Sequence, residues 1–76
     1  MTNTNEVQIY VALVGEGTDV WRPVQAEHLD DDRYRIVSKN NNPADERWEF
    51  GQGEVVRCRP NVFADGVSGL VAFDRA

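Results

Sequence analysis

A second cysteine is missing from this chain of 76 residues, in which Cys58 stands alone. An intramolecular disulfide is therefore excluded, although small secreted domains usually depend on such cross-links. The N-terminal stretch, MTNTNEVQIYVALV, has no basic segment, and Gln8 interrupts its apolar run. We expect neither a signal peptide nor a membrane span there. Together these absences predict a cytoplasmic protein.

Positive charge is also scarce. Thirteen acidic side chains stand against eight basic ones, which gives a net charge of -5 and an isoelectric point near 4.6. Such a surface repels nucleic acids and anionic membranes, so direct binding to either is not expected. The same charge suits a protein partner with a basic surface, although negative charge also serves solubility alone.

Motifs that carry catalysis or bind cofactors are lacking as well. The chain has neither of the common glycine-rich nucleotide loops and no closely spaced cysteine pair, so we predict no cofactor, no metal and no enzymatic activity. A nucleophilic pair of His28 and Cys58 would need both side chains within hydrogen-bonding reach. The predicted strands give no reason to bring them together. A small enzyme or metal-dependent factor that uses His28 and the acidic turn at residues 27–32 is the alternative from another functional class.

Hydrophobic residues make up 41% of the chain, which is enough for a folded core. They alternate with polar residues along several short stretches, as is typical of strands that bury one face. The predicted strands are residues 7–14, 20–29, 34–38, 54–60 and 68–73. The side chains predicted to share one face are, in the first strand, Val7, Ile9, Val11 and Leu13, in the second, Val20, Val24 and Ala26, and in the fourth, Val56 and Cys58, of which Cys58 is expected to be buried.

Turn-forming residues separate these strands. Residues 15–19 and 61–66 are predicted turns, and residues 30–32 are the predicted tip of a hairpin between the second and third strands. Pro23 lacks the amide donor that a central strand needs, so we expect it at an edge, a bend or a bulge. Residues 43–47 have the composition of one short helical turn. Trp48 and Phe50, two positions apart, are expected to face the core together.

Five short strands without a long amphipathic helix predict an all-β fold, a small and strongly bent antiparallel barrel of the SH3-like type. Closing the sheet removes exposed edges, which a small protein tolerates poorly. An OB-like barrel is the alternative, although it usually has longer strands and a helix between the third and fourth. Residues 7–73 should form one domain, with residues 1–6 as a flexible N-terminus and residues 74–76 as a tail.

Several segments carry a resemblance to other proteins. They are EGTDVWRPV at residues 16–24, YRI at residues 34–36, the pair Trp48 and Phe50, and GEVVRC at residues 53–58. Over most of residues 7–60 the chain is similar to a group of small, uncharacterised bacterial proteins with an SH3-like barrel. The resemblance implies that fold and no particular activity. The chain departs from the group at residues 39–42, where a shorter and less polar loop is expected.

The candidate partner-binding residues are one tryptophan and a set of carboxylates in the middle of the chain. Trp21 is expected on the strand face opposite Val20 and Val24, where it would be an amphipathic anchor for a partner. The alternative is that Trp21 packs in the core against Trp48 or Phe50. The carboxylates would together imitate a row of phosphates; they are Asp19, Glu27, Asp30, Asp31, Asp32, Asp45, Glu46 and Glu49. Cross-strand ion pairs with acidic neighbours are predicted for Arg22, Arg35, Arg57 and Arg59.

These observations predict a non-enzymatic protein-binding module. It would act as an inhibitor or adaptor, like phage inhibitors and immunity proteins, by occupying a basic surface on its partner. The alternative is a structural or ligand-sensing module that works as a homodimer through an open barrel edge near Pro23.

Overall fold

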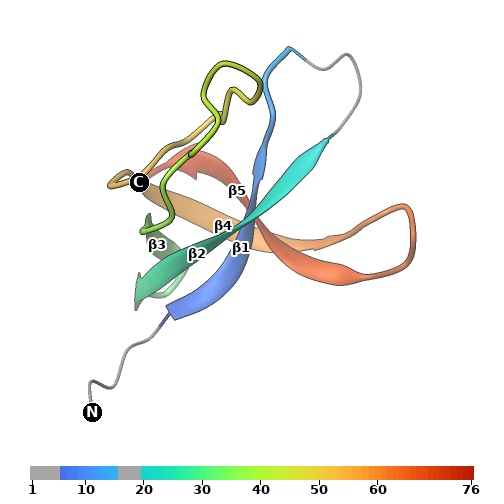
Figure 1. The fold of residues 1–76 in the computed structure, drawn as a ribbon. Helices are drawn as coiled ribbons and strands as arrows, with labels where there is room; N and C mark the ends of the chain where they lie inside the picture. The colour runs from blue at the N-terminus through green and yellow to red at the C-terminus, as the bar shows by residue number, and fades with distance from the viewer. Residues whose placement is uncertain (1–5, 16–19) are drawn as a thin grey trace.

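The computed structural model describes residues 6–15 and 20–76, and these residues form a barrel of five strands (Figure 1). The strands are β1 (Glu6–Ala12), β2 (Trp21–Asp30), β3 (Arg33–Ile36), β4 (Val55–Val62) and β5 (Ser68–Arg75). No described residue belongs to a helix. The prediction of an all-β, SH3-like barrel is confirmed.

The strands follow one another around the barrel in chain order, and each consecutive pair is antiparallel. The barrel closes between β1 and β5, where Tyr10 lies opposite Val71 in a parallel pair. The closing pair is parallel because five strands that reverse direction at every turn leave the first and the last pointing the same way. The predicted antiparallel order therefore holds for every pair except this one. An OB-fold would instead require a Greek-key order of strands.

The core is built from the alternating side chains that the sequence pattern identified. Ile9, Val11 and Val56 are fully buried, and Cys58 is nearly so. The remaining buried members of the cluster are Val24, Ala26, Tyr34, Ile36, Phe50 and Ala72. Val7 in β1 and Val20 just before β2, which belong to the same predicted faces, are exposed, and Leu13 is half-buried. Burial raises the pKa of the Cys58 thiol to about 12, so this side chain acts as a small apolar group.

Pro23 lies where β2 is bonded on one side only. β2 pairs with β1 from Trp21 onwards, but its pairing with β3 begins at Ala26. The amide of Gln25 donates to Ser38 Oγ at 2.8 Å, so the backbone of Gln25 points away from β1. Since backbone groups two residues apart point the same way, the missing amide of Pro23 falls on that open side. The expectation of an edge position is confirmed.

The hairpin between β2 and β3 also forms where it was predicted. Asp31 adopts a positive φ of 36° at its tip, a conformation that aspartate tolerates better than most residues. The register shifts between His28 and Asp30, as in a β-bulge. β3 is shorter than predicted, because it ends at Ile36. Val37 and Ser38 still donate to the carbonyl oxygen of Gln25.

The long segment between β3 and β4 contributes two aromatic side chains, Trp48 and Phe50, to the packing of the core. Its predicted helical turn is a single hydrogen-bonded turn, in which the backbone amides of Asp45 and Glu46 both donate to the carbonyl oxygen of Asn42. Trp48 then forms an isolated bridge with Leu13. This bridge lets Phe50 enter the core, 3% exposed, while Trp48 packs against it from outside. The expectation that both rings close the core is confirmed.

β5 reaches further than predicted, through Asp74 and Arg75, and β1 begins one residue earlier, at Glu6. Among the described glycines, Gly69, near the other end of β5, has the tightest surroundings. A methyl group placed on Gly69 would lie 2.6 Å from the Tyr10 ring and 3.0 Å from the Phe63 ring. Glycine is needed here because no larger residue fits between β5 and these two aromatic rings.

Gly69→Ala should therefore destabilise the barrel by about 1–3 kcal/mol through overpacking, since Tyr10 and Phe63 must move to make room. The matched control is Gly51→Ala, because a methyl group there would meet only the Glu54 carboxylate, at 3.7 Å. Urea denaturation followed by circular dichroism measures both changes. Equal stabilities for the two variants would contradict the packing argument.

Candidate functional site

Four of the candidate carboxylates are not free, because arginines neutralise them. Arg33 contacts Asp30, with its Nε 2.6 Å from Oδ1. Arg57 Nε lies 3.0 Å from Asp32 Oδ2. The other two pairs are Arg35 with Glu27 and Arg22 with Glu46. The cross-strand ion pair expected for Arg35 is present, because Arg35 on β3 lies opposite Glu27 on β2. Arg22 and Arg57 pair instead with carboxylates outside the strands, Glu46 and Asp32. Arg59 lies over the Phe73 ring, 4.7 Å from its centroid.

The remaining candidate carboxylates lie in two separate places. Asp31 is exposed at the tip of the β2–β3 hairpin. Asp45 and Glu49 are exposed on the segment between β3 and β4, where Asp45 accepts a hydrogen bond from the Asn42 side chain. Asp19 lies outside the described residues. The described carboxylates thus alternate with arginines and do not form an uninterrupted acidic row.

Trp21 occupies a different surface from these carboxylates. It is half-buried at the start of β2 and lies outside the core cluster that contains Phe50. Its nearest aromatic neighbour is Phe63, in the turn between β4 and β5, with ring centroids 6.0 Å apart. The structure therefore places Trp21 beside a ring that the sequence analysis did not single out.

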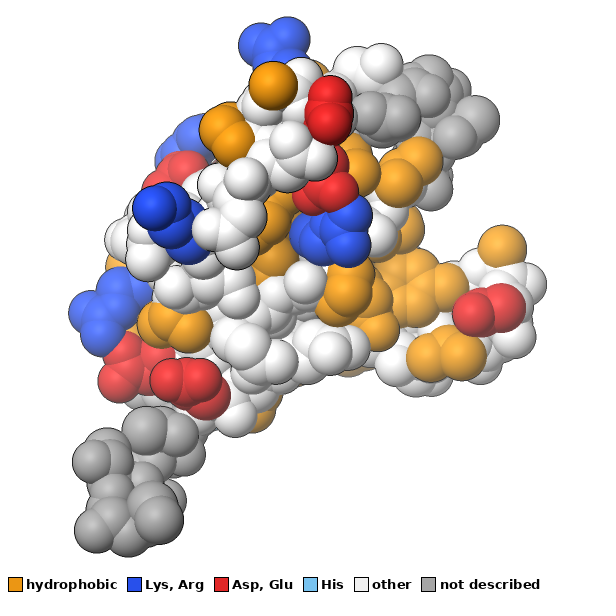
Figure 2. Space-filling view, in the orientation of Figure 1, with side chains coloured by type: hydrophobic (Ala, Val, Ile, Leu, Met, Phe, Trp, Pro, Cys, Tyr) orange, Lys and Arg blue, Asp and Glu red, His pale blue; other side chains and the backbone are white. Residues whose placement is uncertain are grey.

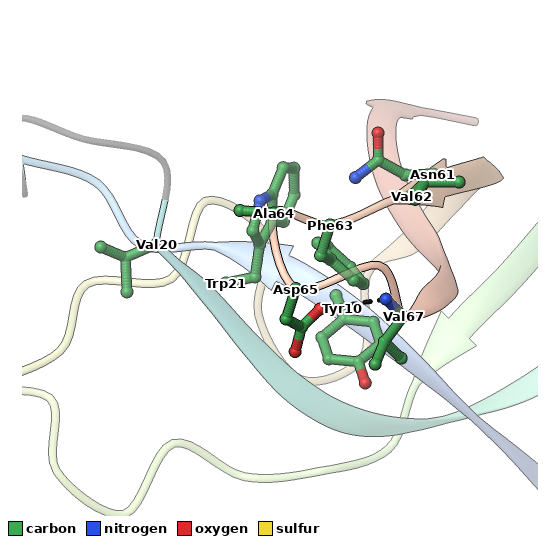
Figure 3. Close-up of a pocket in the computed structure, with 9 residues that line it drawn as sticks. All are labelled: Tyr10, Val20, Trp21, Asn61, Val62, Phe63, Ala64, Asp65 and Val67. Carbon is green, nitrogen blue, oxygen red and sulfur yellow. Dashed lines mark hydrogen bonds between the residues drawn. The ribbon is translucent and has the colours of Figure 1, made fainter.

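Trp21 helps to line an open hollow of about 700 Å³ between the β1–β2 side of the barrel and the β4–β5 hairpin. We call it the aromatic hollow, after its rings Tyr10, Trp21 and Phe63. Figure 3 shows the Phe63 ring lying between the other two. Tyr10 meets Phe63 edge to face, with centroids 4.7 Å apart, a geometry that aromatic pairs favour.

Exposed aliphatic side chains extend this aromatic surface. Val20, Val62 and Val67 line the same hollow and are 36%, 68% and 51% exposed. They are three of the six large hydrophobic residues that are exposed in the described parts of the chain. In Figure 2, hydrophobic side chains gather between the body of the barrel and the projecting hairpin. An exposed apolar patch of this kind is typical of a contact surface.

One charged group belongs to the aromatic hollow. Asp65 stands at its rim on the β4–β5 turn, and its Oδ1 accepts a hydrogen bond from the Val67 amide at 3.0 Å (Figure 3). Among the described residues that line the hollow, none is a lysine or an arginine. The hollow therefore combines aromatic rings, aliphatic side chains and one carboxylate.

Tyr10, Phe63 and Asp65 line the hollow although no sequence pattern indicates them as members of a site. The sequence predicts a turn over residues 61–66, whereas β4 continues through Val62 and the turn follows it. An aromatic residue in a turn is unusual, because turns mostly carry small and polar residues. Phe63 is thus the sequence feature that could indicate a site here, although it does not reveal which other rings lie beside it.

A second, more polar hollow of about 350 Å³ lies beside Pro23, at the open side of β2. Glu46 is one of its lining residues, and its carboxylate accepts hydrogen bonds from Arg22 Nε at 2.9 Å and from the Trp48 indole at 3.1 Å. These bonds hold the pKa of the Glu46 carboxyl below its ordinary value of 4.5. The wall of this hollow therefore contains the Arg22–Glu46 ion pair, which connects the β3–β4 segment to β2.

His28 and Cys58 are not arranged as a nucleophilic pair. The His28 ring stacks on Tyr34 at 4.6 Å, and its Nε2 lies 2.9 Å from the carbonyl oxygen of Asp31, to which it donates. Cys58 is buried in the core. Within residues 6–15 and 20–76, no three potential ligands gather in a way that would hold a metal ion.

Among the described residues, no helix is of the length and hydrophobicity that crossing a membrane requires.

Comparisons of the chain with protein-family models, with curated proteins and with solved structures gave no match. The resemblance to small bacterial barrel proteins therefore stays a prediction, and the site must be interpreted from its own geometry.

The lowered pKa of Glu46 predicts a pH-dependent contribution to stability. A carboxylate whose pKa is lower in the folded state stabilises the fold above its unfolded pKa, near 4.5, and stops doing so as the pH falls through the folded pKa. Glu46→Gln should thus be less stable than the original protein at pH 7, and the difference should shrink as the pH falls below 4.5 and through the folded pKa. The midpoints of urea unfolding, measured for both proteins from pH 7 down to acidic pH, test this prediction.

The control for this experiment is Glu49→Gln, which removes the same charge from an exposed carboxylate of the same segment. Glu49 has no ion pair with a described residue. Its substitution should change the urea midpoint little across this pH range. A stability deficit of Glu46→Gln that persists unchanged at low pH would show that the ion pair is not its cause.

Proposed function

We propose that this protein is a non-enzymatic protein-binding module, and that it contacts its partner through the aromatic hollow. The observation that carries the proposal is the gathering of Trp21, Val62 and Val67 on one open surface at the edge of the barrel. Apolar side chains exposed in this way are costly in water, and covering them with a partner recovers that free energy.

The shape of the hollow supports an extended protein segment as the ligand. Its volume of about 700 Å³ lies within the range of small-ligand and peptide pockets. Small domains use aromatic-lined grooves to bind extended peptides, because rigid rings offer a large contact area at little entropic cost. Trp21 is the expected centre of the contact, since tryptophan is enriched among the residues that dominate binding energies.

The charge of the chain supports a basic partner, as the sequence analysis predicted. The net charge of -5 favours association with a positively charged protein. Because arginines neutralise Glu27, Asp30 and Asp32, we move the centre of the proposed contact from the acidic turn to the aromatic hollow. An inhibitor or adaptor role, in which the module covers part of a basic surface, is retained in this proposal.

The proposal predicts that Trp21 is required for peptide binding. A displayed library of random twelve-residue peptides is selected against the immobilised protein, and the enriched peptides are then titrated individually. Trp21→Ser should weaken their binding by at least about thirtyfold, the effect of losing a dominant contact residue. Leu29→Ser is the matched control, because Leu29 is 42% exposed but does not line the hollow.

Two outcomes would contradict the proposal. The first is a selection that enriches no peptide, or only peptides that bind the Trp21→Ser variant equally well. The second is a molecular mass of twice 8.6 kDa by light scattering that Trp21→Ser reduces to the monomer value. That result would assign the hollow to a second copy of the chain, in favour of the homodimer alternative. Circular dichroism of both variants verifies that they are folded.

A further inference from the structure

We infer that the aromatic hollow takes the side chain of an arginine, presented by an extended and otherwise apolar segment of the partner protein. This inference rests on the proposed protein-binding function and names the chemistry that the hollow selects. It is argued from the aromatic rings, from the carboxylate at the rim and from the way this chain uses its own arginines.

The rings provide the first part of the argument. Tyr10, Trp21 and Phe63 stand in a row in Figure 3, joined by the centroid separations of 4.7 and 6.0 Å. The face of an aromatic ring carries partial negative charge and attracts a cation, most strongly in tryptophan. Trp21 and Phe63 are only partly buried, so they leave aromatic surface for a ligand to cover.

Asp65 provides the second part. Its Oδ1 is engaged by the Val67 amide, which fixes the carboxylate at the rim of the hollow. Oδ2 has no hydrogen bond or ion pair with any described residue. This differs from the paired carboxylates Asp30 and Asp32. Because none of the described residues that line the hollow is a lysine or an arginine, a cation brought by the partner would meet a carboxylate oxygen without competition from them.

The chain's own arginines show that guanidinium groups pack on aromatic rings in this molecule. Arg57 and Arg59 lie over Phe73, at 5.3 and 4.7 Å from its centroid. Arg75 lies over Phe50 at 5.1 Å and also contacts a carboxylate, that of Glu54. The aromatic hollow offers the same two partners, rings and a carboxylate, but without the guanidinium.

Arginine fits this site better than lysine. Its guanidinium is planar, so it stacks on rings while its edge donates to a carboxylate, and it sheds water more readily than an ammonium group. The valines at the rim, Val62 and Val67, would contact apolar residues on either side of the arginine. The hollow should therefore prefer a segment in which arginine is flanked by aliphatic residues.

The experiment compares two peptides that differ in charge alone. Acetyl-Gly-Val-Arg-Val-Gly-amide and its citrulline counterpart, which is neutral and nearly isosteric, are titrated to about 10 mM into the isotope-labelled protein, a range that detects millimolar binding. The arginine peptide should shift the NMR signals of Tyr10, Trp21 and Phe63 and should bind at least about fivefold tighter than the citrulline peptide.

Matched aspartate variants locate the source of this preference. Asp65→Asn should bring the arginine peptide close to the affinity of the citrulline peptide. Asp74→Asn should keep the preference, although Asp74 is likewise exposed and accepts a backbone hydrogen bond through Oδ1, from Arg75. Both variants lose one negative charge, so a general effect of net charge would change them equally.

Three results would overturn the inference. One is equal binding of the two peptides, or no shift at the highest concentration. Another is an arginine preference that Asp65→Asn and Asp74→Asn weaken alike. The last is movement of the same aromatic signals when the protein alone is concentrated, which would mean that a second copy fills the hollow. If library peptides still depend on Trp21 while the arginine preference is absent, the inference fails but the proposed binding function stands.

Discussion

The barrel depends on the close approach of β5 to the rings of Tyr10 and Phe63, which Gly69 makes possible. Tyr10 is also the residue of β1 that lies opposite Val71 where the barrel closes. A side chain at Gly69 would force these rings outward, at the same end of the molecule where the sheet has only one parallel pair to hold it shut. Barrel closure and the shape of the aromatic hollow therefore follow from one steric constraint.

In the rest of the described structure, buried polar side-chain atoms have hydrogen-bond partners. Around the barrel, arginines pair with carboxylates of neighbouring strands or turns, as Arg57 on β4 does with Asp32 in the β2–β3 turn. Such exposed pairs contribute little to stability individually, but they remove local charge from the surface. Asp65 differs because its carboxylate lies next to aromatic rings and, among the described residues, bonds to a backbone amide alone. This contrast supports our placing the recognition of a partner at the hollow.

Much of the fold could be predicted from the sequence because it depends on local alternation. The alternation of apolar and polar residues put Ile9 and Val11 on one strand face and Val56 and Cys58 on another, and all four are buried. Because proline has no amide donor, Pro23 was expected at an edge, where the structure has it. The site could not be predicted in the same way. Asp32 and its partner Arg57 are 25 positions apart, so charge counts did not reveal their pairing. The rings of the hollow likewise come from segments that are distant in the sequence. They come together because the barrel closes, which no local sequence pattern reveals.

Stability and binding are separable at some positions of the hollow and not at others. Tyr10 and Phe63 pack on Gly69, so substitutions there would alter the barrel together with the contact surface. Trp21 and Asp65 do not supply the atoms nearest to Gly69, so their replacement should leave the closest contacts of Gly69 in place. In a domain of 76 residues with little stability to spare, this separation matters. It allows the chemistry of the proposed partner site to change at two positions while the steric constraint that closes the barrel is kept.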